Sequence, residues 1–296
     1  MSVTSALFTG VSGLLNNGEA INVIGNNIAN VNTTGFKSSR TLFDDMLYTS
    51  IGNNSQVGRG MAMQKIDNIF SSGSTQNTSS VTDLALQGNS FFALKPPTTA
   101  APVPAQNSAL LSRAGSFHVD NTLTLINPEG YQVLDTQGNP IKFLDTGLPA
   151  NVATDFSKIV KIEPNGLISY LAKDGVSTLY YNTSGTVGIA TTPANALTVQ
   201  KLAIVSPVDP SALEKAGGNL YNPTAAAGIP AVAFSLAANT PNGTSNKVLS
   251  NSLEQSNVDM ATEFVNLIVT QRAYSANSKT ITTADEMTQE VLNLKR

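Results

Sequence analysis

The chain has 296 residues, 41% of them hydrophobic, which is enough for a folded core and argues against a disordered protein. Only 12% are charged and the net charge is −3, so the basic surface that nucleic-acid binding requires is excluded. The absence of cysteine excludes disulfides and thiolate metal sites, and no apolar run approaches the ~20 residues that span a bilayer. We therefore expect no nucleic-acid partner and no membrane insertion.

Residues 1–35 have the apolar spacing of a helix that packs against another helix. The residues expected at this assembly interface stand three, four or seven positions apart: Leu7, Val11, Leu14, Ile21, Ile24 and Ile28. Glycines and asparagines interrupt the stripe, and a helical glycine costs ~1 kcal/mol relative to alanine. We expect a helix that is loose alone, forms on packing and ends with Gly35 as its C′ residue. The start has no basic region, so we expect no cleaved Sec signal peptide.

In the middle of the chain, the residue pattern changes from that of a helix to that of β-strands. Residues 36–56 are predicted to be a connector, in which residues 36–48 form either a second short helix or an irregular stretch. Short apolar runs separated by Gly, Asn, Asp and Pro turns predict a β-rich outer domain over residues 57–240, an antiparallel sandwich or barrel. Within it, residues 96–105 are a predicted surface loop, and residues 141–200 are interpreted as a reduced insertion.

Residues 241–296 are predicted to be a return segment followed by a long helix. Ser256 or Asn257 is the expected N-cap, with Asp259 in the first turn, and Lys295 and Arg296 suit the C-terminal dipole. The expected interface residues are Phe264, Leu267, Tyr274, Ile281, Val291 and Leu294. The predicted fold is mixed α and mainly β, with paired coiled-coil-like terminal helices and an antiparallel β-rich middle domain.

The sequence offers no constellation of catalytic, cofactor-binding or metal-binding residues. His118 is the only histidine and has no cysteine to complete a metal site. Gly58-Arg59-Gly60 lacks the third glycine and the lysine of a phosphate-binding loop. The adjacent carboxylates Asp44/Asp45 and Asp285/Glu286 point about 100° apart on a helix, so they do not converge. We expect no enzyme and no cofactor.

Motifs at both ends resemble those of one known family. The run INVIGNNIANVNTTGFK (21–37) resembles the N-terminal signature of flagellar rod and hook proteins. LEQSNVD (253–259), FVNLI (264–268) and QRAY (271–274) resemble their C-terminal signature. The interior runs DLALQGNSFF (83–92), RAGSF (113–117) and AGGNLY (216–221) extend the resemblance over nearly the whole chain.

This resemblance implies a structural subunit that is exported uncleaved through the flagellar type III apparatus and polymerises helically. It implies paired terminal helices that line a central channel, with β-rich domains outside. A weakly helical N-terminal segment suits this export, because a chain threaded through a narrow channel must not keep a stable helix. The implied partners are further copies, the export apparatus, the hook cap, and neighbouring rod and hook–filament junction proteins.

The sequence favours the flagellar hook among the members of this family. Distal rod subunits carry an extra segment after an Asp-Leu-Leu-Tyr-like stretch, whereas here DMLY (45–48) is followed after nine residues by Gly58. The ending NLKR (293–296) is also hook-like, although 296 residues is short for a hook protein. We therefore expect a subunit of the extracellular hook, a tube that transmits motor torque to the filament. The alternatives are a distal rod subunit in the periplasm and a monomeric β-rich binding module with a helical stalk.

Overall fold

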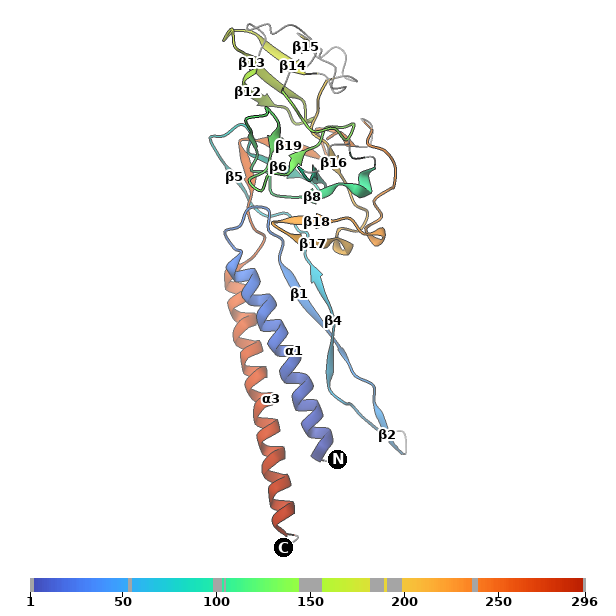
Figure 1. Ribbon diagram of the computed structural model, residues 1–296. Helices are drawn as coiled ribbons and strands as arrows, with labels where there is room; N and C mark the ends of the chain where they lie inside the picture. The colour runs from blue at the N-terminus through green and yellow to red at the C-terminus, as the bar shows by residue number, and fades with distance from the viewer. Residues whose placement is uncertain are drawn as a thin grey trace. The chain divides into compact units, whose positions relative to one another are not determined.

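The chain forms two compact units in the computed structural model, which describes residues 3–52, 55–97, 103, 105–143, 156–181, 189–190, 199–235 and 239–294. The first unit contains Met1–Asn32, Lys37–Ile69 and Val258–Arg296, and the second contains Thr33–Phe36 and Phe70–Asn257. The predicted fold class is confirmed, because the chain begins and ends with a long helix and the residues between them form antiparallel β-strands (Figure 1). Residues 37–69, divided in the sequence prediction between a connector and the β-rich domain, are grouped with the helices.

The first unit is built from two helices and a β-ribbon. Its elements are α1 (Val3–Ala29), β1 (Ser39–Asp45), β2 (Thr49–Gly52), β3 (Ser55–Val57), β4 (Met61–Asn68) and α3 (Met260–Leu294). The prediction of a second helix or irregular connector after residue 36 is wrong, because β1 pairs with β4 along its whole length, from Ser39 opposite Asn68 to Asp45 opposite Met61. β2 pairs with β3 and so prolongs this ribbon.

The ends of the two helices differ from the sequence prediction. Asp259, not Ser256 or Asn257, caps α3, since its Oδ1 accepts the N–H of Ala261 at 3.1 Å and its Oδ2 the hydroxyl of Thr262 at 2.6 Å. α1 ends at Ala29, so Gly35 is not its C′ residue. The predicted dipole partners Lys295 and Arg296 lie outside the described residues.

The second unit is organised around an antiparallel sheet, whose order in the described residues is β17-β18-β8-β7-β11-β10-β9, with β16 also paired to β7. Its strands are β7 (Phe91–Lys95), β8 (Leu110–Ser112), β9 (His118–Val119), β10 (Leu125–Ile126), β11 (Gln132–Val133), β16 (Ile204–Val205), β17 (Glu214–Gly217) and β18 (Leu220–Asn222). Short 3-10 turns accompany this sheet at Gln106–Ser108, Pro210–Ala212 and Ala225–Ala227. Phe92 and Leu94 of β7 enter one hydrophobic core, and Phe91 and Ala93 enter the other. The alternation of a strand therefore gives this sheet a buried core on each face.

Smaller sheets complete the second unit. β12 (Phe156–Ile162), β13 (Ile168–Ala172), β14 (Thr178–Tyr181) and β15 (Ile189–Ala190) form an antiparallel sheet within the predicted insertion at residues 141–200. β5 (Thr75–Asn77) pairs with β20 (Ser252–Glu254), and β6 (Leu84–Gln87) pairs with β19 (Lys247–Ser250). The segment leading to α3 is therefore a pair of strands. Most of the predicted loop at residues 96–105 lies outside the described residues.

Candidate assembly surface

The helices α1 and α3 lie side by side and run in opposite directions (Figure 1). Asn27, near the end of α1, donates to Glu263 Oε1 near the start of α3 at 3.1 Å. At the other end, a Cβ added at Gly10 would lie 2.9 Å from Ile281 Cγ1. These two pairs define an antiparallel register along most of α1.

Small residues, rather than the predicted large ones, occupy the closest part of this helix–helix seam. Gly10, Gly13 and Ala20 of α1 are buried, and so is Ala284 of α3. A Cβ added at Gly13 would lie 2.6 Å from Asn277 Nδ2. Because a glycine has no Cβ, these positions let the two backbones approach closely. The glycines that weaken α1 as an isolated helix therefore also permit its packing.

Asn27 is a buried hub that joins three elements of the first unit, and it is only 1% exposed. Its amide group donates to Ser39 O at 2.7 Å and accepts the Ser39 N–H at 3.0 Å, which fixes the start of β1 against α1. The same Nδ2 donates to Glu263 of α3. Burial raises the pKa of Glu263, and the hydrogen bond from Asn27 opposes that rise. Nothing marks Asn27 in the sequence, because it stands among many other asparagines.

The β-ribbon packs against α1 through small polar contacts. Asn16 Nδ2 donates to Met61 O at 2.8 Å, and the Met61 N–H donates to Ser12 Oγ at 3.4 Å. Gly60 has φ +105°, and a Cβ there would collide with Ser12 Oγ. The segment Gly58-Arg59-Gly60 therefore needs glycine at its last position for both conformation and space.

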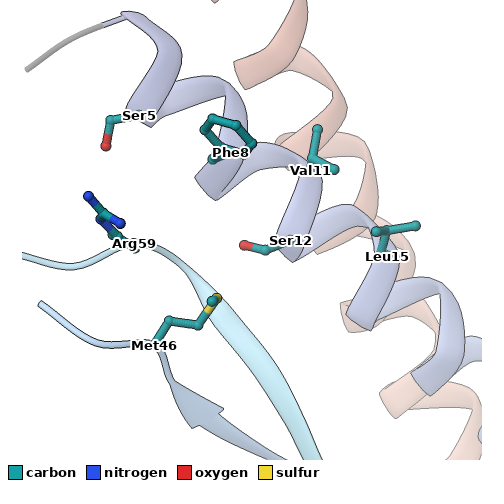
Figure 2. A pocket seen from close by; sticks show the side chains of 7 residues that line it. All are labelled: Ser5, Phe8, Val11, Ser12, Leu15, Met46 and Arg59. Atoms are coloured by element: carbon teal, nitrogen blue, oxygen red, sulfur yellow. The ribbon is translucent and has the colours of Figure 1, made fainter.

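A groove of about 500 Å³ lies between α1 and this ribbon (Figure 2). Its lining residues are Ser5, Phe8, Val11, Ser12, Leu15, Met46 and Arg59. Phe8 is 73% exposed and Leu15 63% exposed, although both are apolar. Ser5 and Ser12 point from α1 toward the segments that carry Arg59 and Met46. The groove is thus an exposed apolar surface with a guanidinium group at its edge.

The structure separates the twelve predicted interface residues into two groups. Half-buried positions are Leu7, Leu14, Ile21, Ile24, Ile28, Leu267 and Ile281. Exposed positions are Val11, Phe264, Tyr274, Val291 and Leu294. Further exposed apolar side chains on the helices are Phe8, Leu15, Met260, Val265, Ile268, Val269, Met287 and Leu292. Apolar surface gathered in this way on two helices is typical of a surface that another molecule covers.

A buried ion pair in the second unit holds the strand that leads to α3. Arg113 and Glu254 are 1% and 2% exposed, and Arg113 Nη1 lies 3.2 Å from Glu254 Oε2. The guanidinium group also donates to the carbonyl oxygens of Leu86 and Gly88, while Glu254 Oε1 accepts the Gly73 N–H at 3.0 Å. Both charges are therefore paired and hydrogen-bonded, as buried charges require.

The segment that follows α1 is joined to the same strand of the second unit. The N–H of Gly35 donates to the carbonyl of Glu254 at 2.8 Å, and Gly35 has φ +69°. Its missing side chain also matters, because a Cβ there would lie 2.5 Å from the backbone nitrogen of Ala114. The chain thus leaves α1 and enters α3 through neighbouring backbone segments of one unit.

Other kinds of site find no support in the described part of the molecule. No group of three or more His, Asp or Glu side chains gathers there in a way that could hold a metal ion. Among the described helices, none combines the length and apolarity needed to cross a membrane. His118 is exposed on β9, and Asp44 and Asp45 lie in β1. The features that stand out are the helix pair and its groove.

Comparison with known protein families gives matches at both ends of the chain. Residues 7–37 match the family described as "Flagella basal body rod protein". Residues 249–294 match the family described as "Flagellar basal body rod FlgEFG protein C-terminal". These two ranges include most of α1 and all of the described α3.

Similarity to individual relatives extends over the whole chain. The flagellar basal-body rod protein FlgG of Bacillus subtilis is 36% identical, with 98% of this chain and 99% of the relative covered. FlgG of Buchnera aphidicola is 32% identical, with 93% of each covered. The flagellar hook protein FlgE of Borreliella burgdorferi is 35% identical, but only 52% of this chain and 35% of the relative are covered. The chain belongs to the flagellar rod and hook protein family.

Proposed function

We propose that this chain is a subunit of the flagellar basal-body rod, where copies polymerise helically into a hollow shaft that carries motor torque. The observation that supports the rod most strongly is the extent of similarity, since rod relatives match along nearly all of both chains. Hook relatives match about half of this chain and a third of their own length. The sequence had favoured the hook, and the hook is now the second candidate.

The preference for the hook rested on sequence features that discriminate only weakly between hook and rod subunits. A short segment between residues 48 and 58 and a four-residue ending are small parts of the chain, whereas the rod relatives align across its whole β-rich middle. Chain length points the same way, because 296 residues are matched nearly end to end by rod relatives.

The physical basis of polymerisation in this proposal is the exposed apolar surface of the first unit. Phe8 and Leu15 of α1, and Val265, Val269 and Leu292 of α3, are each more than half exposed. Burying such side chains between copies contributes roughly 1.5–3 kcal/mol for each one fully covered. The partners that follow are further copies of this chain, adjacent rod and hook proteins, and the flagellar export apparatus. The proposed location is the periplasmic rod, reached without cleavage of the N-terminus.

Electron micrographs of basal bodies from a strain that lacks this chain test the proposal. A rod subunit predicts truncated rods that carry no hook, and a plasmid copy of the gene should restore both structures. Complete rods without hooks would contradict the rod assignment and favour the hook. Complete rods with hooks would contradict both.

A further inference from the structure

The last turns of α3 extend beyond the helix that covers the rest of it. Since Gly10 lies opposite Ile281 and the helices are antiparallel, Val3 lies opposite about Thr288. The described part of α1 begins at Val3, so no described residue of α1 runs beside the final residues of α3. We call residues 287–294, which begin beside Val3 and continue past it, the α3 overhang.

The α3 overhang has an apolar face with one carboxylate beside it. Met287, Val291 and Leu294 follow the i, i+4, i+7 spacing of one helix face, and they are 55%, 62% and 85% exposed. Glu290 stands three residues after Met287 and four before Leu294, which places it on the same side. The overhang therefore presents an apolar ridge with a negative charge along it.

The groove on α1 has the complementary character. Phe8, Val11 and Leu15 follow the i, i+3, i+7 spacing, and at 100° per residue they lie on the face of α1 opposite Gly10 and Gly13. That face points away from the chain's own α3 and is bordered by the β-ribbon, with Arg59 at the edge (Figure 2). An apolar trough with one cation suits an apolar ridge with one carboxylate.

We propose that in the polymer the α3 overhang of one copy lies in the α1 groove of a second copy, with Glu290 paired to the second copy's Arg59. This inference rests on the proposed function, because it names the contact through which neighbouring subunits join. The contact is between molecules, since a straight α3 that runs along one side of α1 cannot reach the groove on the opposite side. Groove and overhang are different surfaces, so the contact is heterologous and can repeat without limit along an assembly.

Charge makes the middle of a neighbouring α3 a less suitable occupant of the groove than the face that carries Glu290. Ile268 is an exposed apolar residue there, but Arg272 and Lys279 share its surface. Laying this surface into the groove would bring two cations toward Arg59, and like charges at an interface are unfavourable. The described residues after Lys279 carry the carboxylates Asp285, Glu286 and Glu290, and the cations Lys295 and Arg296 follow them in the sequence.

Cysteine cross-linking tests this contact cleanly, because the chain has no cysteine of its own. Full-length Phe8→Cys or Leu15→Cys protein is mixed with full-length Val291→Cys or Leu294→Cys protein, polymerised and mildly oxidised. Each molecule carries one cysteine, so a mixed disulfide dimer reports a contact between copies. We expect such a dimer from at least one of the four mixtures, because a disulfide needs Cα atoms within about 7 Å. Val269→Cys, which replaces an apolar residue with 60% exposure, is the matched control and should give none.

The outcomes separate this inference from the proposed function. Tubes that form but give no link in any of the four mixtures overturn the contact and leave the function standing. A link from the groove to Val269→Cys in place of the overhang also overturns it. Failure of the unsubstituted chain to form tubes contradicts the proposed function, and the inference with it.

Charge reversal supplies a second, independent measurement on the full chain. Arg59→Glu should slow tube growth about tenfold, since it places a carboxylate against Glu290 of the next copy. Adding Glu290→Arg to the same chain should restore most of the growth rate, whereas adding Lys279→Glu should not. Equal growth of Arg59→Glu with and without Glu290→Arg would overturn the pairing.

Discussion

Asp135 shows how one buried carboxyl group makes the second unit sensitive to pH. Its Oδ1 accepts the N–H groups of Gln137 and Asn139 at 2.9 and 2.8 Å, while its buried Oδ2 has no hydrogen-bond partner among the described residues. Burial raises the pKa of Asp135 from 3.8 to about 6, against the opposing effect of those two N–H donors. The folded state therefore holds this proton more tightly than the unfolded chain does.

The sign of the resulting pH dependence follows directly. A folded pKa above the unfolded one means that residue 135 favours folding below about pH 4, and that this contribution is lost as pH rises through about 6, by roughly 3 kcal/mol. The variant Asp135→Asn should therefore gain unfolding free energy relative to the wild type between pH 4 and pH 7. Urea unfolding at both pH values measures the difference.

Asp174 provides the matched control for this prediction. It also accepts turn N–H groups, from Val176 and Ser177, but it is exposed. Hydrogen bonds from Ser177 and Val176 lower the pKa of Asp174, so its contribution is present at neutral pH and lost in acid. Asp174→Asn should thus change with pH in the opposite direction. The same pH trend for both variants would contradict the assignment of the raised pKa to burial.

The pair Arg113–Glu254 predicts a large effect from removing one charge. Arg113→Met leaves Glu254 buried without its cation, which should lower the unfolding free energy of the second unit by about 3–5 kcal/mol. The double variant Arg113→Met/Glu254→Leu should recover much of this loss, because no charge then remains buried. Calorimetry of the three proteins measures both steps.

The exposed pair Arg40–Asp67 is the control for the buried one. Its atoms are 3.1 Å apart, but the Arg40 side chain is 60% exposed. Arg40→Ala should therefore cost about 0–1 kcal/mol. A loss from Arg113→Met as small as that from Arg40→Ala would contradict the stabilising role of the buried pair.

At the residue scale, the sequence predicted which types of residue form turns, but not which distant residues contact one another. The glycines at 88, 130, 138 and 166 stand among the Gly, Asn, Asp and Pro residues from which turns between strands were predicted, and each has positive φ. Asn27, Arg113 and Glu254 were not predicted as partners, because their contacts join positions far apart in the chain. A single sequence without pairing information carries no signal for such contacts.

At the scale of elements, the glycines of α1 have two opposing effects that can be separated. Gly25 has no atom within 4 Å of an added Cβ, whereas at Gly10 that Cβ would lie 2.9 Å from Ile281. Gly25→Ala should stabilise the helix pair by about 0.5–1 kcal/mol, since alanine has the higher helix propensity. Gly10→Ala should lose that gain, because Ile281 must move.

Thermal melts of the helical circular dichroism signal compare these two variants. Adding Ile281→Val to Gly10→Ala removes the Cδ1 methyl group, 3.6 Å from the added Cβ, and leaves a shorter side chain that can move aside, so part of the melting temperature should be recovered. A melting temperature of Gly10→Ala equal to that of Gly25→Ala would contradict the close packing of α1 against α3 at Gly10.

The sequence predicted the terminal helices well and the ribbon poorly. Helical periodicity identified the locations of α1 and α3, although it favoured large residues where Gly10, Gly13 and Ala20 lie against α3. β1 and β4 form a two-stranded ribbon, which is marginal alone and depends on contacts with α1 such as Asn27 to Ser39. Local sequence cannot reveal a strand whose stability comes from a helix elsewhere in the chain.

For the whole molecule, family membership and structure agree that the helical unit is the place to seek assembly contacts. The family matches fall on residues 7–37 and 249–294, which include the apolar residues that remain exposed on α1 and α3. The second unit has its own two cores and does not depend on those side chains. Polymerisation and folding of the second unit should therefore be separable by mutation.

Electron microscopy of polymers formed by the full-length variant Ile281→Asp tests this most directly. Ile281 is half-buried beside Gly10, so an aspartate there places a charge in the helix seam. Thr283→Asp, at an exposed position of the same helix, is the control. We predict no tubes from Ile281→Asp, normal tubes from Thr283→Asp, and an unchanged thermal transition of the second unit in both. Tubes of normal yield and diameter from Ile281→Asp would contradict assembly through the paired terminal helices.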